Sequence, residues 1–163
     1  MASEKEMFLK TWETEYQTTL KVLKAYPQER QEYKPNEKSK SAKELAWVFA
    51  AEEQAVIPGV IAGNIDWASM AKTPETMKEA LHEYEKIHKE MVKLFEDTPE
   101  ETFKQTMKFF VAPKKMGDVP RMQVLWMILM DQVHHRGQFS VYLRLVGAKV
   151  PSIYGPTADE PWD

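Results

Sequence analysis

Two residues in the last third of the chain, Asp131 and His135, have the side chains and the spacing to do chemistry together. Residues four apart on a helix lie one above the other on the same face, so this carboxylate and this imidazole can hold one metal ion or share one proton. The run 124–130 that precedes them is apolar. Ionisable groups on the inward face of such a helix cost free energy unless a partner satisfies them, which indicates a site.

Three interpretations of this pair remain open from the residues. In the first, Asp131 and His135 bind a metal ion together with Glu52, because carboxylate and imidazole groups suit zinc, manganese or iron. In the second, Asp131 orients His135, or else His134, as a general base without a metal. In the third, Gln138 completes a satisfied polar pair that only fixes the register of the helix.

Composition limits the class of protein. A chain of 163 residues suits one domain with a single core, taken here as 1–163. The net charge of −3 provides no basic surface for nucleic acid. Cysteine is absent, so any thiol chemistry needs a thiol from a cofactor or substrate. We expect no apolar run long enough to span a membrane and no signal peptide, hence a cytoplasmic location.

Start and stop signals predict four long helices and a short one. Two capping boxes, a Thr-Pro pair and several prolines mark the predicted ends. The predicted helices span 3–26, 41 to a kink or end at Pro58-Gly59, about 74–96, 98 toward Phe109, and about 120–146. We expect loops at 27–40, 62–72 and 111–119.

The apolar positions within the predicted helices step by three or four residues, as on an amphipathic helix. We find no internal repeat and no alternation typical of a strand, which favours an all-α protein. The predicted fold is an antiparallel four-helix bundle with a short extra helix and an extended C-terminal tail. Ile153 and Tyr154 in that tail are expected to pack back onto the bundle.

Several segments together carry a family resemblance. They are His134-His135-Arg136-Gly137-Gln138, Tyr142-Leu143-Arg144, Gly147, the tail from Pro151 to Pro156, the stretch from Ser41 to Trp47, and Trp12. The chain resembles the DinB-like (damage-inducible) four-helix-bundle superfamily over nearly its whole length. That family is distinct from the DNA polymerase that shares the name.

The resemblance implies an up-up-down-down bundle, frequent dimerisation and a divalent metal, nickel or zinc, held by three histidines. Characterised relatives include thiol-dependent S-transferases and isomerases that use bacillithiol or mycothiol. The family pattern places its histidines where this chain has Val48, Asp131 and His135. The three-histidine site is therefore absent. Glu52 lies one helical turn beyond Val48, and its longer side chain is expected to reach toward the place of the missing ligand.

We therefore expect a DinB-like protein with a small-molecule pocket between the second and the last helix. As an enzyme it would be a metal-dependent transferase of the thiol S-transferase type. Asp131 and His135 would be catalytic, and Asp131, His135 and Glu52 would bind zinc, nickel or manganese, with a low-molecular-weight thiol as a further cofactor. The alternative is a non-catalytic, metal-free member that acts as a dimeric binding or stress-response protein. In either case we expect a homodimer without nucleic-acid or membrane partners.

Three other polar residues have weaker signals. His88 lies near the apolar stripe of its helix without a ligand partner at i±4, which favours a packed histidine over a metal ligand. Arg136 and Arg144 have the charge to bind an anionic substrate near the mouth of the site. For Arg136, pairing with a neighbouring carboxylate or a dimer contact is an equally good interpretation.

Overall fold

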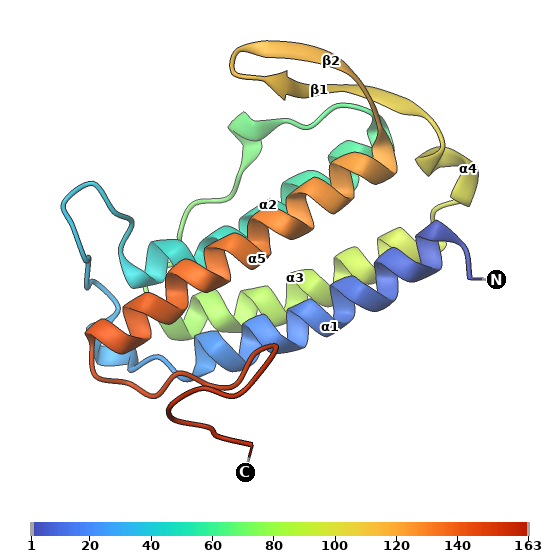
Figure 1. Cartoon of the computed structure of the whole chain (residues 1–163). Helices are drawn as coiled ribbons and strands as arrows, with labels where there is room; N and C mark the ends of the chain where they lie inside the picture. The colour runs from blue at the N-terminus through green and yellow to red at the C-terminus, as the bar shows by residue number, and fades with distance from the viewer. Residues whose placement is uncertain (1, 163) are drawn as a thin grey trace.

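Four long helices form the body of the protein, and a short helix and a hairpin link the third to the last (Figure 1). The structure is a computed structural model that describes residues 2–162. In chain order the elements are α1 (Glu4–Lys24), α2 (Ala42–Ala62), α3 (Met77–Asp97), α4 (Glu100–Phe103), β1 (Thr106–Ala112), β2 (Lys115–Pro120) and α5 (Arg121–Leu145). Short 3-10 turns lie at Gln28–Arg30 and Trp67–Ser69.

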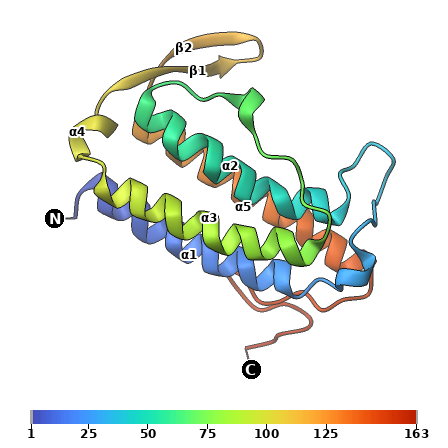
Figure 2. The ribbon, with the colours of Figure 1, turned by 180° about the vertical axis from the view of Figure 1, so that it is seen from behind.

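The long helices form a ring in which α2 contacts α3 and α5, and α1 contacts the same two helices (Figures 1 and 2). Arg121 at the start of α5 donates to the Ile61 carbonyl at the end of α2 (2.9 Å), so these helices are antiparallel. Lys5 at the start of α1 donates to the Thr98 carbonyl just after α3 (2.6 Å). Trp126 and Arg136 of α5 contact Glu4 and Glu15 of α1, so α1 and α5 are parallel. Along the chain the helix directions are therefore up, down, down, up, and not the expected up, up, down, down. The expected all-α bundle is confirmed.

Both predicted capping boxes are present, and a third one lies at a residue that we did not predict. Reciprocal hydrogen bonds close capping boxes at Ser3 for α1 and at Ser41 for α2. The third box lies at Thr76, whose hydroxyl accepts from the Glu79 N–H at 3.2 Å, and α3 starts at Met77. The predicted start near 74 is therefore three residues early, because Thr76 satisfies an orphan N–H group.

Of the two outcomes predicted for Pro58-Gly59, a kink or an end, the end is wrong, because the second helix continues to Ala62. The chain turns back at Gly63 in the left-handed conformation (φ 86°), and the Asn64 N–H donates to the Gly59 carbonyl at 2.8 Å. Ile65 packs against Gly59 so closely that an added Cβ would lie 2.8 Å from its Cα. These tertiary contacts stabilise the last turn of α2 and compensate for the helix hydrogen bond that is lost at Pro58.

The segment after α4 is a β-hairpin, which we did not predict. Its strands pair antiparallel from Thr106 opposite Pro120 to Ala112 opposite Lys115. Met107 and Phe109 are buried while Thr106 and Lys108 are exposed, so the alternation typical of a strand is present but covers only four residues. The expected helix toward Phe109 stops at Phe103, and the expected loop at 111–119 is wrong. Met107 and Phe109 instead cover the end of the bundle core.

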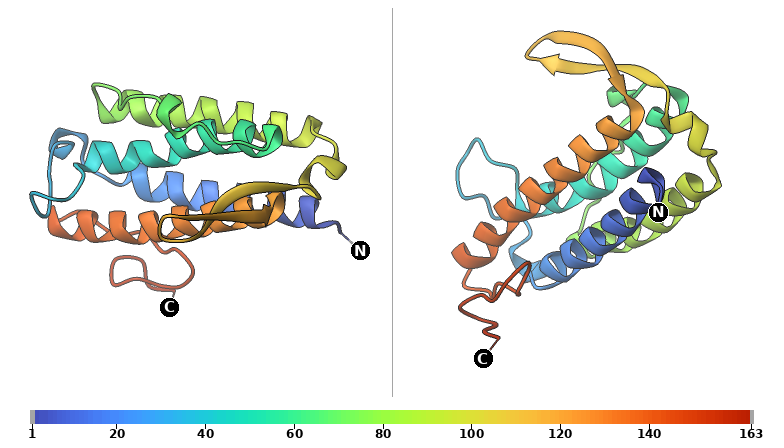
Figure 3. Two further views of the ribbon diagram at one scale, coloured as in Figure 1. Left: turned by 90° about the horizontal axis from the view of Figure 1, so that it is seen from above. Right: turned by 45° about the vertical axis from the view of Figure 1, so that its right-hand side comes forward.

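The C-terminal tail lies against the bundle beside α1 and α5, well away from the hairpin (Figure 3). The Tyr154 hydroxyl donates to Glu15 Oε2 on α1 at 2.8 Å, although its ring is largely exposed. Asp159 accepts from the Val150 N–H and pairs with Arg144 at 2.7 Å. Ile153 packs against the core as expected, whereas Tyr154 contacts the bundle through its hydroxyl and its ring stays exposed.

One helix of the described chain, α2, is long and apolar enough by length and composition to cross a membrane. This differs from the expectation that no apolar run reaches that length. In the bundle, 67% of its most apolar 18-residue window is buried. Because the core helix of a globular protein passes the same test, this finding is weak evidence for a membrane span.

Replacing Gly63 by Ala tests the end of α2. An Ala there adopts a strained positive φ and places its Cβ 2.5 Å from Arg121 Nη2. Gly147 has a similar φ of 76° but open space around it, so Gly147→Ala is the matched control. We expect Gly147→Ala to lower the free energy of unfolding by about 1 kcal/mol and Gly63→Ala by about 2–3 kcal/mol. Urea unfolding measures both, and equal losses would show that the Arg121 contact contributes nothing.

Candidate metal centre between α2 and α5

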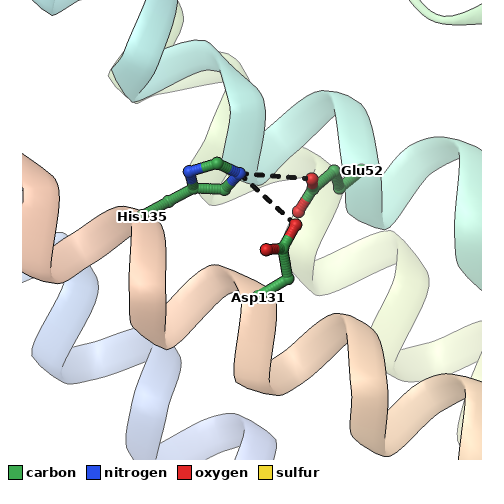
Figure 4. A group of neighbouring side chains, drawn as sticks. All are labelled: Glu52, Asp131 and His135. Carbon is green, nitrogen blue, oxygen red and sulfur yellow. Dashed lines mark ion pairs between the residues drawn. The ribbon is translucent and has the colours of Figure 1, made fainter. Parts of the chain in front are cut away.

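Three side chains converge where α2 crosses the middle of α5 (Figure 4). Glu52 comes from α2, and Asp131 and His135 come from successive turns of α5. His135 Nε2 lies 3.4 Å from Asp131 Oδ2 and 3.9 Å from Glu52 Oε1. One ligand atom from each residue lies within 4.8 Å of the other two. The structure therefore brings together the three residues that the sequence analysis grouped.

These separations fit a bound cation. Two ligands about 2.1 Å from a tetrahedral ion lie about 3.4 Å apart, close to the imidazole–carboxylate distances here. Nitrogen and oxygen donors of this kind suit zinc and manganese. The group is also the only such cluster of three or more ligand residues found in residues 2–162.

Glu52 is the member of the group for which burial matters most. Its side chain is buried, and Oε2 has no hydrogen-bond partner among the described residues. Burial, together with the nearby carboxylates of Asp131 and Glu53, raises the pKa of Glu52 to about 8. The Gln132 amide and Lys40 act in the opposite direction. An orphaned, buried acid of this kind needs either a proton or a cation.

The other two members lie at the rim and not in the interior. Half of the Asp131 side chain and a fifth of the His135 side chain are exposed. The initial argument, that both groups are buried on an inward face, is therefore wrong for Asp131. Met130, next to Asp131, is exposed as well, so the apolar run of α5 does not imply burial all round. A small molecule can reach the group from the Asp131 side.

His135 is held in position by a neighbour. Gln138 Oε1 lies 2.9 Å from His135 Nδ1, and Gln138 Nε2 lies 3.1 Å from His134 Nε2. With Nδ1 occupied, His135 presents Nε2 to Glu52 and Asp131. His134 is exposed and does not belong to the group. Gln138 thus makes the contact that the third interpretation expected of it, and this contact is also compatible with the other two interpretations.

A second buried polar cluster lies beside the first, and sequence reasoning missed its centre, Glu53. Glu53 accepts a hydrogen bond from Trp12 Nε1 at 2.8 Å and lies 2.9 Å from His88 Nδ1. Burial raises the pKa of Glu53, while His88 and Trp12 lower it. His88 stacks on Tyr16 with centroids 3.5 Å apart, and its Nε2 lies 3.3 Å from Glu13 Oε1 without hydrogen-bond alignment. The packed role expected for His88 is correct.

Arg136 has a structural position instead of a place at the site mouth. Its guanidinium is 1% exposed and pairs with Glu15 Oε2 at 2.6 Å. Nη1 also donates to the Glu15 carbonyl and to Thr19 Oγ1. Of the two expectations for this residue, pairing with a neighbouring carboxylate describes it correctly. Arg144 pairs with Asp159 of the tail and also lies away from the site.

Comparisons with known proteins agree on one family. The sequence profile of the DinB family matches residues 1–162. The chain belongs to the DinB family. It is 26% identical over 159 residues to the uncharacterized protein YrdA of Bacillus subtilis (strain 168), covering 94% of this chain and 89% of that protein.

Two crystal structures of DinB-like proteins have the same fold. The protein from Bacillus cereus ATCC 10987 has a TM-score of 0.74 and 22% identity, covering 90% of this chain and 95% of its own. YjoA from Bacillus subtilis has a TM-score of 0.73 and 17% identity, covering 96% of this chain and 99% of its own. The family resemblance read from the sequence is therefore confirmed by the family profile. The two crystal structures, at 22% and 17% identity, support the fold alone.

The raised pKa of Glu52 predicts a stability effect in metal-free protein. Its usual pKa of 4.5 rises to about 8 on folding, so the folded state holds a proton that the unfolded chain has lost between these values. Stability from this group is therefore lost as pH rises from about 5 to 8. Relative to Glu52→Gln, the wild type should lose roughly 2–3 kcal/mol over that range in EDTA. Parallel curves of unfolding free energy against pH for the two proteins would contradict this.

Removing Arg136 should destabilise the bundle strongly. Arg136→Met leaves the Glu15 carboxylate without its buried partner, which typically costs about 3–5 kcal/mol. Arg144→Met removes a charge from the same helix, but at a half-exposed side chain, and should cost under about 1 kcal/mol. Thermal unfolding of both variants measures the difference, and similar melting temperatures would show that the buried pair is not structural.

Proposed function

We propose that this DinB-family protein binds one divalent metal ion through Glu52, Asp131 and His135 and acts with it on a small molecule in the cytoplasm. One observation carries the proposal: the buried Glu52 Oε2 has no hydrogen-bond partner, and it belongs to a group with ligand spacing. A cation satisfies this carboxylate without a proton. Two carboxylates and one imidazole favour manganese or zinc over nickel.

The proposed reaction class is thiol transfer of the S-transferase type. When bound, the ion supplies Lewis acidity toward a water or a thiol. The chain's own residues set the geometry: Gln138 fixes the His135 ring, and the exposed side of Asp131 gives access. Because the chain has no cysteine, the thiol comes from a low-molecular-weight co-substrate. Large exposed apolar side chains on α5, Met130 and Leu145, support a homodimer.

The second candidate is a metal-free, non-catalytic member that acts as a dimeric binding or stress-response protein. His135 favours it, because both ring nitrogens already have neighbours, Gln138 Oε1 at 2.9 Å and Asp131 Oδ2 at 3.4 Å. Glu52 then stays protonated near neutral pH, and the group serves as a polar lock between α2 and α5.

Metal content distinguishes the two candidates. Untagged protein is dialysed at pH 8 against manganese, zinc or nickel and analysed by mass spectrometry. We expect about one ion per chain in the wild type and at least a tenfold loss of affinity in Glu52→Gln and His135→Ala. The control, His134→Ala, removes the adjacent exposed imidazole and should bind normally. Below pH 8 the affinity should fall by about tenfold per pH unit, because Glu52 must lose its proton.

Wild-type protein that takes up no stoichiometric ion under any of these conditions would contradict the metal proposal and favour the second candidate. Equal loss of metal in His134→Ala and His135→Ala would show that the ion binds elsewhere on α5.

A further inference from the structure

A hollow of about 500 Å³ opens beside the candidate metal centre, between residues 38–40 and the second half of α5. His135 and Gln138 form the wall that it shares with the centre. Leu45, Val141 and Tyr142 provide an apolar surface on its other sides. This volume suits a small molecule that combines an apolar part with a few polar groups.

Two lysines, Lys38 and Lys40, bring positive charge to this hollow. Neither pairs with a carboxylate within 4 Å among the described residues, whereas nearby Lys43 lies 2.7 Å from Glu32 Oε1. The two ammonium groups are therefore free to pair with a ligand.

The backbone that carries the lysines is fixed against α5. The Tyr142 hydroxyl donates to the Lys40 carbonyl at 2.9 Å, across the lip of the hollow. The Lys38 N–H donates to Asn36 Oδ1 at 3.0 Å, and the Ala42 N–H donates to the Tyr33 carbonyl at 3.0 Å. A ligand thus meets a formed wall instead of a loop that it must order first.

The charge balance determines the kind of ligand. With a divalent ion bound, the charges of Glu52 and Asp131 are neutralised, and Lys38 and Lys40 leave the hollow with two positive charges. The residues that line the hollow include these two lysines and no carboxylate, so an anionic group is favoured.

We propose that this hollow is the substrate site of the protein. It takes a small molecule with an anionic group at Lys38 and Lys40, an apolar part on Leu45, Val141 and Tyr142, and its reacting end at His135. The assignment of a substrate rests on the proposed function above. The binding preference for an anion rests on the two lysines alone. The anion preference and the proposed function can therefore fail separately in the test.

The test is a titration of metal-free and zinc-loaded protein with 3-phenylpropionate and its neutral analogue, 3-phenylpropionamide, at low salt, followed by NMR. We expect the carboxylate to bind at least about fivefold more tightly than the amide and to shift signals of residues 38–40 and 135–142. The preference should disappear in Lys38→Gln/Lys40→Gln. It should persist in Lys114→Gln/Lys115→Gln, a matched loss of two charges in the hairpin. A parallel titration with phenyl phosphate shows whether phosphate or carboxylate is the better anion.

Equal affinity for the carboxylate and the amide, signals that shift elsewhere, or an unchanged preference in Lys38→Gln/Lys40→Gln would overturn the proposal. A retained carboxylate preference in a protein that binds no metal would support the anion site and contradict only the metal function. A protein that takes up zinc normally but does not prefer the carboxylate would support the metal function and contradict only the anion site.

Discussion

The structure around α2 depends on two adjacent carboxylates that this helix brings into the bundle. Both carboxylate oxygens of Glu53 have polar partners, because Trp12 donates to one oxygen and His88 contacts the other. Glu52 faces the opposite neighbour, α5, and one of its oxygens has no partner. A buried acid in that state must be neutralised by a proton or by a cation. This requirement links the fold to the function, because the groups beside it are the imidazole and the carboxylate that a cation needs.

The bundle positions this group through polar contacts as well as through its core. Arg136 joins α5 to α1 through Glu15, and His88 joins α3 to α2 through Glu53. These contacts fix the rotation of each helix, so that residues 131 and 135 of α5 face Glu52 and the 38–40 segment. The centre therefore lies between a closed polar interior and an open, positively charged hollow, an arrangement that suits a small anionic substrate.

Much of the fold followed from local signals in the sequence. Capping boxes and proline positions predicted four long helices, and the His-Arg-Gly-Gln segment indicated the family that the comparisons confirm. Tertiary contacts explain the two wrong predictions of secondary structure. Ile65 packs on the last turn of α2 and stabilises it beyond Pro58, and residues 106–112 form a strand whose buried side chains cover the end of the bundle core. Helical spacing with Asp131 and His135 predicted two members of the centre, and Glu52 followed from its place one turn beyond Val48. Nothing local distinguished Glu53 or Arg136 as buried, because their partners lie 18 to 121 residues away in the chain.

The most direct test of this account is anomalous X-ray scattering from crystals of the protein loaded with manganese at pH 8. The account predicts one strong anomalous peak per chain, about 2.0–2.2 Å from a Glu52 oxygen, an Asp131 oxygen and His135 Nε2. Crystals of Glu52→Gln grown in the same way should lack the peak. Wild-type crystals with no peak between α2 and α5, or with a peak that persists without Glu52, would contradict the claim that this buried carboxylate is satisfied by a metal ion.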